Sequence, residues 1–192
     1  IDTYDVSIKL LDYGDYLFHT NDNKSIVFEF KTCKDFISSM ENKSLFQELS
    51  NQTINNEYSY LVICGDFEET FEELYFTVPH YRYKYKSKYV LQSRMRKQVQ
   101  GAIYRIYAMY IPIIFADDEN DAFDKMLKVS SKYLSDFFEE SSLSEHATKE
   151  NARTKTIRNT VAKTNTITVV VRLPFIHRFV ILLLFIYFYT VP

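Results

Sequence analysis

Residues 25–31 are the segment that most constrains the fold of this chain. Their sequence, Ser-Ile-Val-Phe-Glu-Phe-Lys, is preceded by turn-forming residues and predicts a strand. Because successive side chains of a strand point to opposite faces, Glu29 and Lys31 share one face, whereas Phe28 and Phe30 share the other. The strand therefore fixes an acid and a base side by side.

Gly14-Asp15 precedes this strand by the length of a hairpin. An apolar run over residues 6–18 is predicted to be the partner strand, and the turn-rich residues 20–24 (Thr-Asn-Asp-Asn-Lys) are predicted to be the loop. Such a hairpin brings Asp15 beside Glu29. Two carboxylates are then expected at one place on the sheet.

Two carboxylates and a lysine suit metal-dependent phosphate chemistry. Mg²⁺ prefers oxygen ligands and keeps several waters, so Asp15 and Glu29 with a substrate phosphate are enough to hold it. The Lys31 ammonium is then placed to stabilise charge that develops on the phosphorus. Spacing alone leaves a second interpretation open, in which Glu29 and Lys31 are an ordinary pair on a solvated strand face.

Strand and helix patterns alternate along the first 138 residues, which favours an α/β sandwich with a central mixed sheet. After the hairpin, the expected elements are a helix over residues 35–52 with Asp35 as N-cap, a buried strand over 58–64, an acidic helix or loop over 68–74, and helices over 92–110 and about 121–138. The apolar positions expected to pack in the last two are Met95, Val99, Ile103, Ile106, Phe123, Met126, Leu127, Val129 and Leu134.

One stretch of the chain is rich in bases and contains no acids. No Asp or Glu occurs between Glu73 and Asp117, and bases alternate with tyrosines from Tyr81 to Tyr89. An extended segment with this alternation puts basic side chains on one face and tyrosines on the other. The basic side chains suit the phosphates of DNA, and the tyrosines suit stacking on unpaired nucleobases. A solvated loop or an edge strand protected by lysines is the alternative. The predicted DNA-binding residues are Arg82, Lys84, Lys86, Lys88, Arg94, Arg96 and Lys97, the last three in the first turns of the 92–110 helix.

The composition argues against several classes of protein. With 192 residues, 46% of them apolar, the chain can bury one sizeable core. Its two cysteines make neither a disulfide framework nor a zinc site and are expected to be reduced structural thiols. Four scattered histidines do not support a histidine-based nucleophile system. Three glycines cannot form a Gly-rich phosphate loop, so no nucleotide cofactor is expected.

The order Gly14-Asp15, Glu29-Phe30-Lys31 and Asp35 resembles the GD…ERK…D signature of XPF-type structure-specific DNA endonucleases, and the archaeal Hef-like branch is the most similar. The resemblance covers about residues 4–138 and includes a helix after the catalytic strand and later core strands over 60–66 and 111–115. It implies a restriction-endonuclease-like fold, a three-layer sandwich in which helices flank a central mixed β-sheet.

The resemblance also implies a chemistry. Asp15 and Glu29 would bind Mg²⁺, with Mn²⁺ as a substitute, Lys31 would assist phosphodiester hydrolysis, and Asp35 would be a supporting acid. The expected function is metal-dependent incision of branched DNA, such as flaps or forks, in DNA repair or replication restart. The expected location is intracellular, with DNA in the cytoplasm or nucleoid.

Family members act as dimers, so the resemblance implies a homodimer. The candidate self-association surface consists of the apolar faces of residues 92–110 and 121–138. Plain core packing explains those two faces equally well.

The sequence departs from the family pattern in two places. Phe30 stands where the family has an arginine, on the strand face opposite the catalytic side chains. The family's Asp-x-Arg-Glu element is not found before Gly14, so an N-terminal strand and helix are expected to be missing, with Asp2, Asp5 or Asp12 as partial substitutes. These departures leave open a second function, a catalytically degenerate DNA-binding scaffold subunit of the same fold.

The composition changes after residue 138. A polar linker over residues 139–166 leads to an apolar tail over 167–192, whose last fourteen residues, Phe179–Pro192, carry no charge. A membrane-spanning helix needs about twenty residues, so a helix or strand buried in the core or against a partner is favoured over a membrane-associated end or an aberrant end of the reading frame. A membrane-linked interaction protein is accordingly the third and last functional hypothesis.

Overall fold

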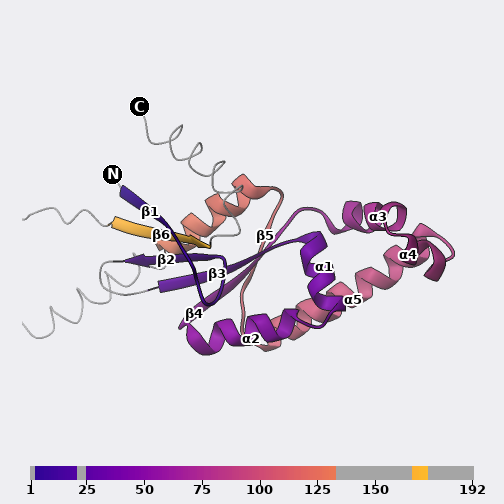
Figure 1. Cartoon of the computed structure of the whole chain (residues 1–192), viewed down its shortest axis with the longest axis horizontal. Helices are drawn as coiled ribbons and strands as arrows, with labels where there is room; N and C mark the ends of the chain where they lie inside the picture. The colour runs from indigo at the N-terminus through magenta and orange to yellow at the C-terminus, as the bar shows by residue number, and fades with distance from the viewer. Residues whose placement is uncertain (1–2, 21–24, 133–165, 173–192) are drawn as a thin grey trace, which may run out of the picture.

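The computed structural model describes residues 3–20, 25–132 and 166–172. Six strands within these residues form one sheet, in the order β1-β6-β2-β3-β4-β5 (Figure 1). The sheet is mixed, because β6 pairs parallel with β1 and antiparallel with β2, whereas β3, β4 and β5 are mutually parallel. The strands are β1 (Thr3–Lys9), β2 (Tyr16–Thr20), β3 (Ser25–Thr32), β4 (Tyr58–Cys64), β5 (Ile113–Ala116) and β6 (Thr166–Arg172).

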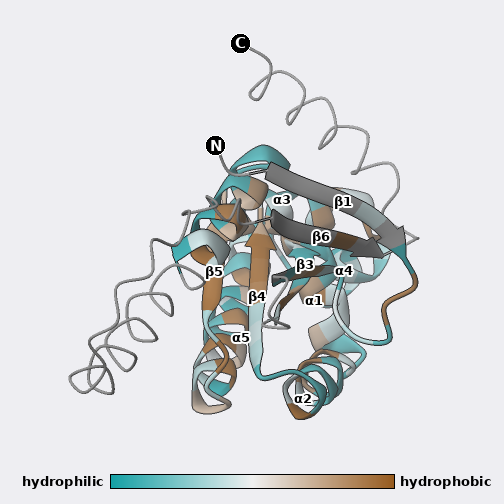
Figure 2. Ribbon diagram, turned by 90° about the vertical axis from the view of Figure 1, so that its left-hand side faces the viewer, coloured by the Kyte–Doolittle hydropathy of each residue, from teal (hydrophilic) through white to brown (hydrophobic). Residues whose placement is uncertain are grey.

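Helices cover both faces of the sheet. On one face, Phe28 and Val62 belong to an apolar cluster with Phe123 of a helix over residues 119–132, drawn in salmon in Figure 1. On the other face, Leu61 and Ile63 pack against α1 to α5. Figure 2 shows β4 and β5 as hydrophobic strands between these layers. The predicted α/β sandwich with a central mixed sheet is thus confirmed. The labelled helices are α1 (Cys33–Glu41), α2 (Leu45–Asn55), α3 (Phe67–Thr77), α4 (Pro79–Lys84) and α5 (Lys88–Ala108).

The predicted hairpin is present as the antiparallel pair β2 and β3, with Tyr16 opposite Phe28. Its loop residues 21–24 lie outside the described residues. The single strand expected over residues 6–18 is wrong, because β1 and β2 are separate strands with β6 between them. The chain turns at Gly14, whose backbone has a φ of 74°. Gly14 lies in the connection between β1 and β2, and this left-handed conformation favours glycine.

The single helix expected over residues 35–52 is also wrong. The chain forms α1 and α2 with a corner between them, where Lys43 has a φ of 67°. The N-cap of α1 is Thr32 rather than Asp35, because the Thr32 hydroxyl accepts a hydrogen bond from the backbone N–H of Asp35. Asp35 is therefore the third residue of the helix.

The extended basic segment expected over residues 81–89 is mostly helical instead. It contains the end of α4, which begins at Pro79, a short link over residues 85–87, and the start of α5. Tyr81 and Tyr85 are four residues apart and both are buried, which matches the spacing of one helix face. The tyrosines alternate with a period of two in the sequence, but Tyr83 and Tyr89 are exposed and only Tyr81 and Tyr85 are buried.

Helix α5 begins at Lys88, four residues before the predicted start. The predicted core positions Met95, Val99 and Ile106 are buried, and Ile103 is partly buried. Of the positions predicted in the last helix, Phe123 and Met126 are buried, Leu127 and Val129 are partly buried, and Leu134 lies outside the described residues.

The beginning of the apolar tail joins the sheet. Strand β6 lies between β1 and β2, and its Val170 side chain is only 2% exposed. In the described part of the chain, no helix is both long and apolar enough to cross a membrane. Residues 139–165 and 173–192 lie outside the described residues.

Candidate active site

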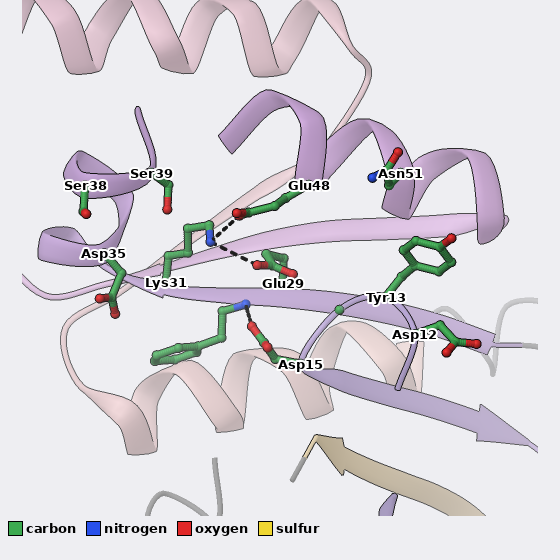
Figure 3. Close-up of a pocket in the computed structure, with 12 residues that line it drawn as sticks. Asp12, Tyr13, Asp15, Glu29, Lys31, Asp35, Ser38, Ser39, Glu48 and Asn51 are labelled. Atoms are coloured by element: carbon green, nitrogen blue, oxygen red, sulfur yellow. Dashed lines mark hydrogen bonds and ion pairs between the residues drawn. The ribbon is translucent and has the colours of Figure 1, made fainter. Parts of the chain in front are cut away.

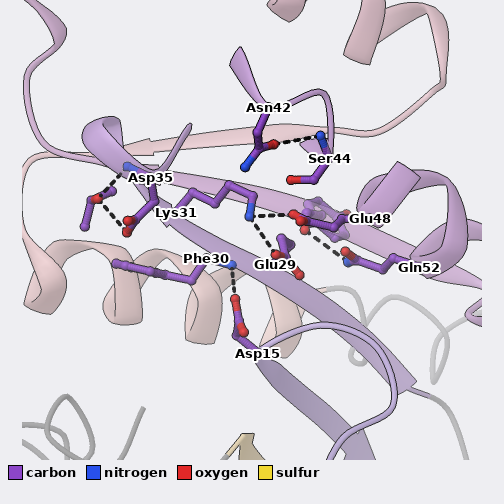
Figure 4. Close-up of polar contacts among 11 residues, drawn as sticks. Asp15, Glu29, Phe30, Lys31, Asp35, Asn42, Ser44, Glu48 and Gln52 are labelled. Atoms are coloured by element: carbon purple, nitrogen blue, oxygen red, sulfur yellow. Dashed lines mark hydrogen bonds and ion pairs between the residues drawn. The ribbon is translucent and has the colours of Figure 1, made fainter. Parts of the chain in front are cut away.

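Asp15 is fixed to the central strand β3 by its backbone and by its side chain. Its N–H donates to the carbonyl of Phe28 at 2.8 Å, and its Oδ2 accepts from the N–H of Phe30 at 2.8 Å (Figure 4). Asp15 directly precedes β2, and these two bonds extend the hydrogen bonding between β2 and β3 by one residue. Continuing the register from the Tyr16–Phe28 pair places Asp15 opposite Glu29, as the hairpin predicted.

Gly14 makes this approach possible. Besides its positive φ, a Cβ on Gly14 would lie 2.4 Å from Cγ2 of Val27 and 3.2 Å from the carbonyl oxygen of Phe28. Real Cβ atoms do not approach other atoms at 2.4 Å. Only glycine therefore lets the turn bring Asp15 against β3 without displacing its neighbours.

Lys31 lies between two carboxylates. Its Nζ is 3.1 Å from Oε1 of Glu29, on the same strand, and 2.8 Å from Oε2 of Glu48, on α2 (Figure 3). The side chains of Lys31 and Glu29 are 10% and 12% exposed, and that of Glu48 is 40% exposed. Glu29 and Lys31 share one face of β3 as predicted, and Phe30 is buried in the cluster on the opposite face.

The two carboxylates control the charge of Lys31. Burial lowers the pKa of Lys31, but the ion pairs with Glu29 and Glu48 outweigh burial and raise the pKa above its usual value. The ammonium is therefore protonated at neutral pH, although it is largely withdrawn from water.

Asp35 lies at the first turn of α1. Its Oδ2 accepts a hydrogen bond from the Thr32 hydroxyl at 2.7 Å, and its backbone N–H donates to the same hydroxyl at 3.1 Å (Figure 4). This reciprocal pair caps α1 and holds the Asp35 side chain at the end of β3.

A single pocket of about 510 Å³ brings the predicted residues together (Figure 3). Asp15, Glu29, Lys31 and Asp35 all line it. Asp12, one of the three acids considered as partial substitutes, lines it as well. The structure places Asp2 outside the described residues and gives no position for the Asp5 side chain.

The pocket offers Mg²⁺ two carboxylate ligands, which is the kind of oxygen ligand that this ion prefers. Among the described residues, no three His, Cys, Asp or Glu side chains are grouped closely enough to hold a metal ion. Mg²⁺ needs fewer protein ligands than that, because water and substrate phosphate complete its octahedron. Asp15 and Glu29 both line the pocket, and the bond to Phe30 occupies one of the about four acceptor positions of the Asp15 carboxylate.

Sequence reasoning missed Glu48. Leu45, Leu49 and Gln52 are buried on one face of α2, and Glu48 follows Leu45 by three residues on the same side. An acid at a core-facing position of an amphipathic helix is a signal that could have identified it.

The predicted DNA-binding residues do not form one extended face. All but Lys88 are exposed on α4, α5 and the short link between them. Lys88 pairs with Glu72 at 2.6 Å, and Arg96 pairs with Glu68 at 2.7 Å. The acidic helix α3 therefore neutralises two of the seven bases. Because α5 starts at Lys88, Arg96 lies in its third turn rather than in the first turns.

The predicted self-association faces are used inside the chain. The apolar face of α5 belongs to the core on one side of the sheet, and that of the 119–132 helix belongs to the core on the other side. Within the described residues, which include the second helix as far as residue 132, core packing accounts for both faces.

Comparisons with known proteins find one family model and two solved structures that this chain resembles. Residues 2–129 match the family model of the ERCC4 domain. Among solved structures, XPF from Aeropyrum pernix in complex with DNA is similar at a TM-score of 0.44 and 20% identity, over 67% of this chain and 52% of that chain. A second structure of XPF from Aeropyrum pernix gives a TM-score of 0.43 and 23% identity, over 68% of this chain and 56% of that chain.

The chain spans just over half the length of these two solved relatives. No curated protein matches it. The XPF-type resemblance is confirmed by the family match, whereas the Hef-like branch stays a prediction. Because the match extends over about two thirds of its 192 residues, the chain belongs to the ERCC4 domain family.

Proposed function

We propose that this chain is a metal-dependent endonuclease that hydrolyses phosphodiester bonds in branched DNA, such as flaps or forks. The observation that carries the proposal is the single pocket lined by Asp15, Glu29, Lys31 and Asp35 in an ERCC4 domain. Such an enzyme acts inside the cell on DNA, in repair or replication restart.

Asp15 and Glu29 would hold Mg²⁺, or Mn²⁺ in its place, and Asp12 is near enough to the pocket to assist. When bound, the metal lowers the pKa of a water molecule and polarises a phosphoryl oxygen. Glu29 then has two roles, because it also orients the Lys31 ammonium at 3.1 Å.

Lys31 stabilises the negative charge that develops as the phosphodiester bond breaks. Its position is fixed before the substrate arrives, because Glu29 and Glu48 hold the ammonium from two elements. A charge that is already oriented needs little reorganisation during the reaction, which is where such groups contribute most. Asp35 supports the site from the capped end of α1.

The substrate would be bound by the exposed bases of α4 and α5. Arg82, Lys84, Lys86, Arg94 and Lys97 are exposed, and none forms an ion pair within the described residues. They offer several positive charges to phosphates, so we expect binding that weakens steeply with salt. We also propose a homodimer, which would use surfaces other than the two buried apolar faces.

The proposal is tested by incubating the chain with labelled fork, flap and linear duplex DNA in Mg²⁺, in Mn²⁺ and in EDTA. We expect incision of the fork or flap that needs the metal ion, and little incision of the linear duplex. Absence of incision on every substrate with either metal would contradict the nuclease assignment.

A DNA-binding scaffold subunit is the second candidate function. It is favoured by Phe30, which stands in place of the family arginine. Fork binding without incision in the same experiment would support this function.

A further inference from the structure

A second cavity, of about 630 Å³, lies beside the corner between α1 and α2. The catalytic pocket is lined by Ser39 of α1 and Glu48 of α2, whereas the second cavity is lined by Glu41 of α1 and Phe46 of α2. The two cavities are therefore built on the same pair of helices. Helices α4 and α5 complete the second one, and Figure 1 shows α1 and α2 beside α5.

Three cations line this second cavity, and each comes from a different part of the fold. Lys43 belongs to the α1–α2 corner, Lys84 to the end of α4, and Arg105 to α5. Within the described residues, none of the three forms an ion pair, in contrast to Lys88 and Arg96, whose charges are matched by α3. The second cavity therefore has a positive surplus that the described part of the chain leaves unmatched.

The cavity also orients its charges. The Arg105 guanidinium carbon lies 4.0 Å from the centre of the Phe46 ring, a cation–π contact that does not use up the N–H donors with which arginine binds anions. Glu41 is the one carboxylate in the lining, and its Oε2 accepts a hydrogen bond from the Tyr81 hydroxyl at 2.6 Å. His80 adds a further polar side chain.

Gly101 is an independent observation at the same place. It lies inside the helix α5 and lines the cavity, and a Cβ added there would meet nothing within 4 Å. Glycine weakens a helix interior, and no neighbouring atom of the described chain requires it here. A glycine that faces a cavity leaves room for a ligand to approach the helix backbone closely.

We infer that this cavity binds backbone phosphates of the nucleic-acid strand that also occupies the catalytic pocket. The inference rests on the proposed DNA substrate. A strand is favoured over a single free phosphate because the three cations come from three separate elements and the cavity adjoins the catalytic pocket across one corner. A strand that runs past this corner would present some of its phosphates to the catalytic pocket and others to the second cavity.

The test is the salt dependence of fork binding by the full chain, measured by fluorescence anisotropy in EDTA. The Lys43→Gln/Lys84→Gln double variant should bind more weakly, and its slope of log K against log salt should be shallower by about 1.4 to 1.8, which is the loss of two phosphate contacts. A matched double variant, Lys34→Gln/Lys128→Gln, removes two exposed lysines outside the cavity and should keep the slope of the unmodified chain.

Gly101 supplies a second variant that should fold without difficulty, because glutamate is a better helix former than glycine. Gly101→Glu places a carboxylate in the cavity and should weaken fork binding by at least about tenfold, the equivalent of losing one strong ionic contact. Gly101→Gln is the matched control for bulk without charge and should weaken binding less.

The outcomes separate this inference from the proposed nuclease. If the unmodified chain cuts forks but all cavity variants bind them with unchanged affinity and slope, the inference is overturned and the nuclease stands. If binding depends on the cavity but no incision occurs, the inference stands and the nuclease fails. If the unmodified chain binds no DNA, both are overturned, even where the cavity binds inorganic phosphate.

Discussion

Lys31 sets the charge balance of the candidate active-site pocket. Its ammonium contacts Glu29 and Glu48 from two different elements, so both acids are neutralised in part without a metal ion. Because Glu29 is also a proposed metal ligand, the ion pair and metal binding draw on the same carboxylate. We therefore expect Lys31 and the metal to be coupled at this residue.

Two glycines allow opposite predictions for the same substitution. Gly14→Ala should lower the free energy of unfolding by about 1–3 kcal/mol, because alanine is strained at a φ of 74° and its Cβ would collide with Val27. Gly101→Ala should raise it by about 0.5–1 kcal/mol, because the new Cβ enters open space within a helix.

Urea denaturation followed by circular dichroism measures both effects. Each variant serves as the control for the other, since both add one methyl group. Equal stability of the two variants would contradict the assigned backbone conformation of Gly14.

At the scale of elements, the sequence was most informative where burial and periodicity agree. Strand β4 has the predicted bounds, because its apolar run is buried on both faces and is bounded by Gly65. The region around α4 was predicted as extended, because basic residues and tyrosines alternate there in the sequence. That alternation contains no information on which tyrosines are buried. Periodicity alone could not reveal that Tyr81 and Tyr85 pack in the core.

The candidate site was predicted in part for a related reason. Asp15, Glu29 and Lys31 come from one hairpin, so local pattern and pairing rules were enough to bring them together. Glu48 comes from α2 and contacts Lys31 only through tertiary packing, which a reading of local spacing does not contain. The pairing of α3 acids with Lys88 and Arg96 was missed for the same reason.

Helix α3 should reduce DNA binding, because it neutralises two cations of α5. The Glu68→Gln/Glu72→Gln double variant frees Arg96 and Lys88 and should bind forked DNA more tightly, with a salt slope steeper by as much as about 1.8. Glu57→Gln/Glu119→Gln removes two acids elsewhere and controls for net charge. Equal binding by both double variants would show that Arg96 and Lys88 do not contact DNA.

At the scale of the molecule, the sheet joins distant parts of the sequence. Strand β6 follows the other strands by about fifty residues, yet it lies between β1 and β2, near one edge of the sheet. Both the first strand and the beginning of the apolar tail therefore belong to the same sheet as the β2–β3 hairpin.

Val170 tests this placement of β6. Val170→Asp puts a charge at a site that is 2% exposed and should lower the free energy of unfolding by about 3–5 kcal/mol. Val90→Asp, at a site that is 51% exposed in the first turn of α5, should change it by less than about 0.5 kcal/mol. If thermal unfolding finds the two variants equally stable, β6 is not part of the core sheet.

The single-turnover rate of fork incision in Mg²⁺ measures whether the pocket around Glu29 hydrolyses phosphodiester bonds. Glu29→Gln keeps the shape of the side chain but removes the charge that would hold the metal and orient Lys31, so the rate should fall by at least about 100-fold. Glu57→Gln, outside the pocket, should cut at the rate of the unmodified chain. Incision by Glu29→Gln at the rate of the unmodified chain would contradict the account.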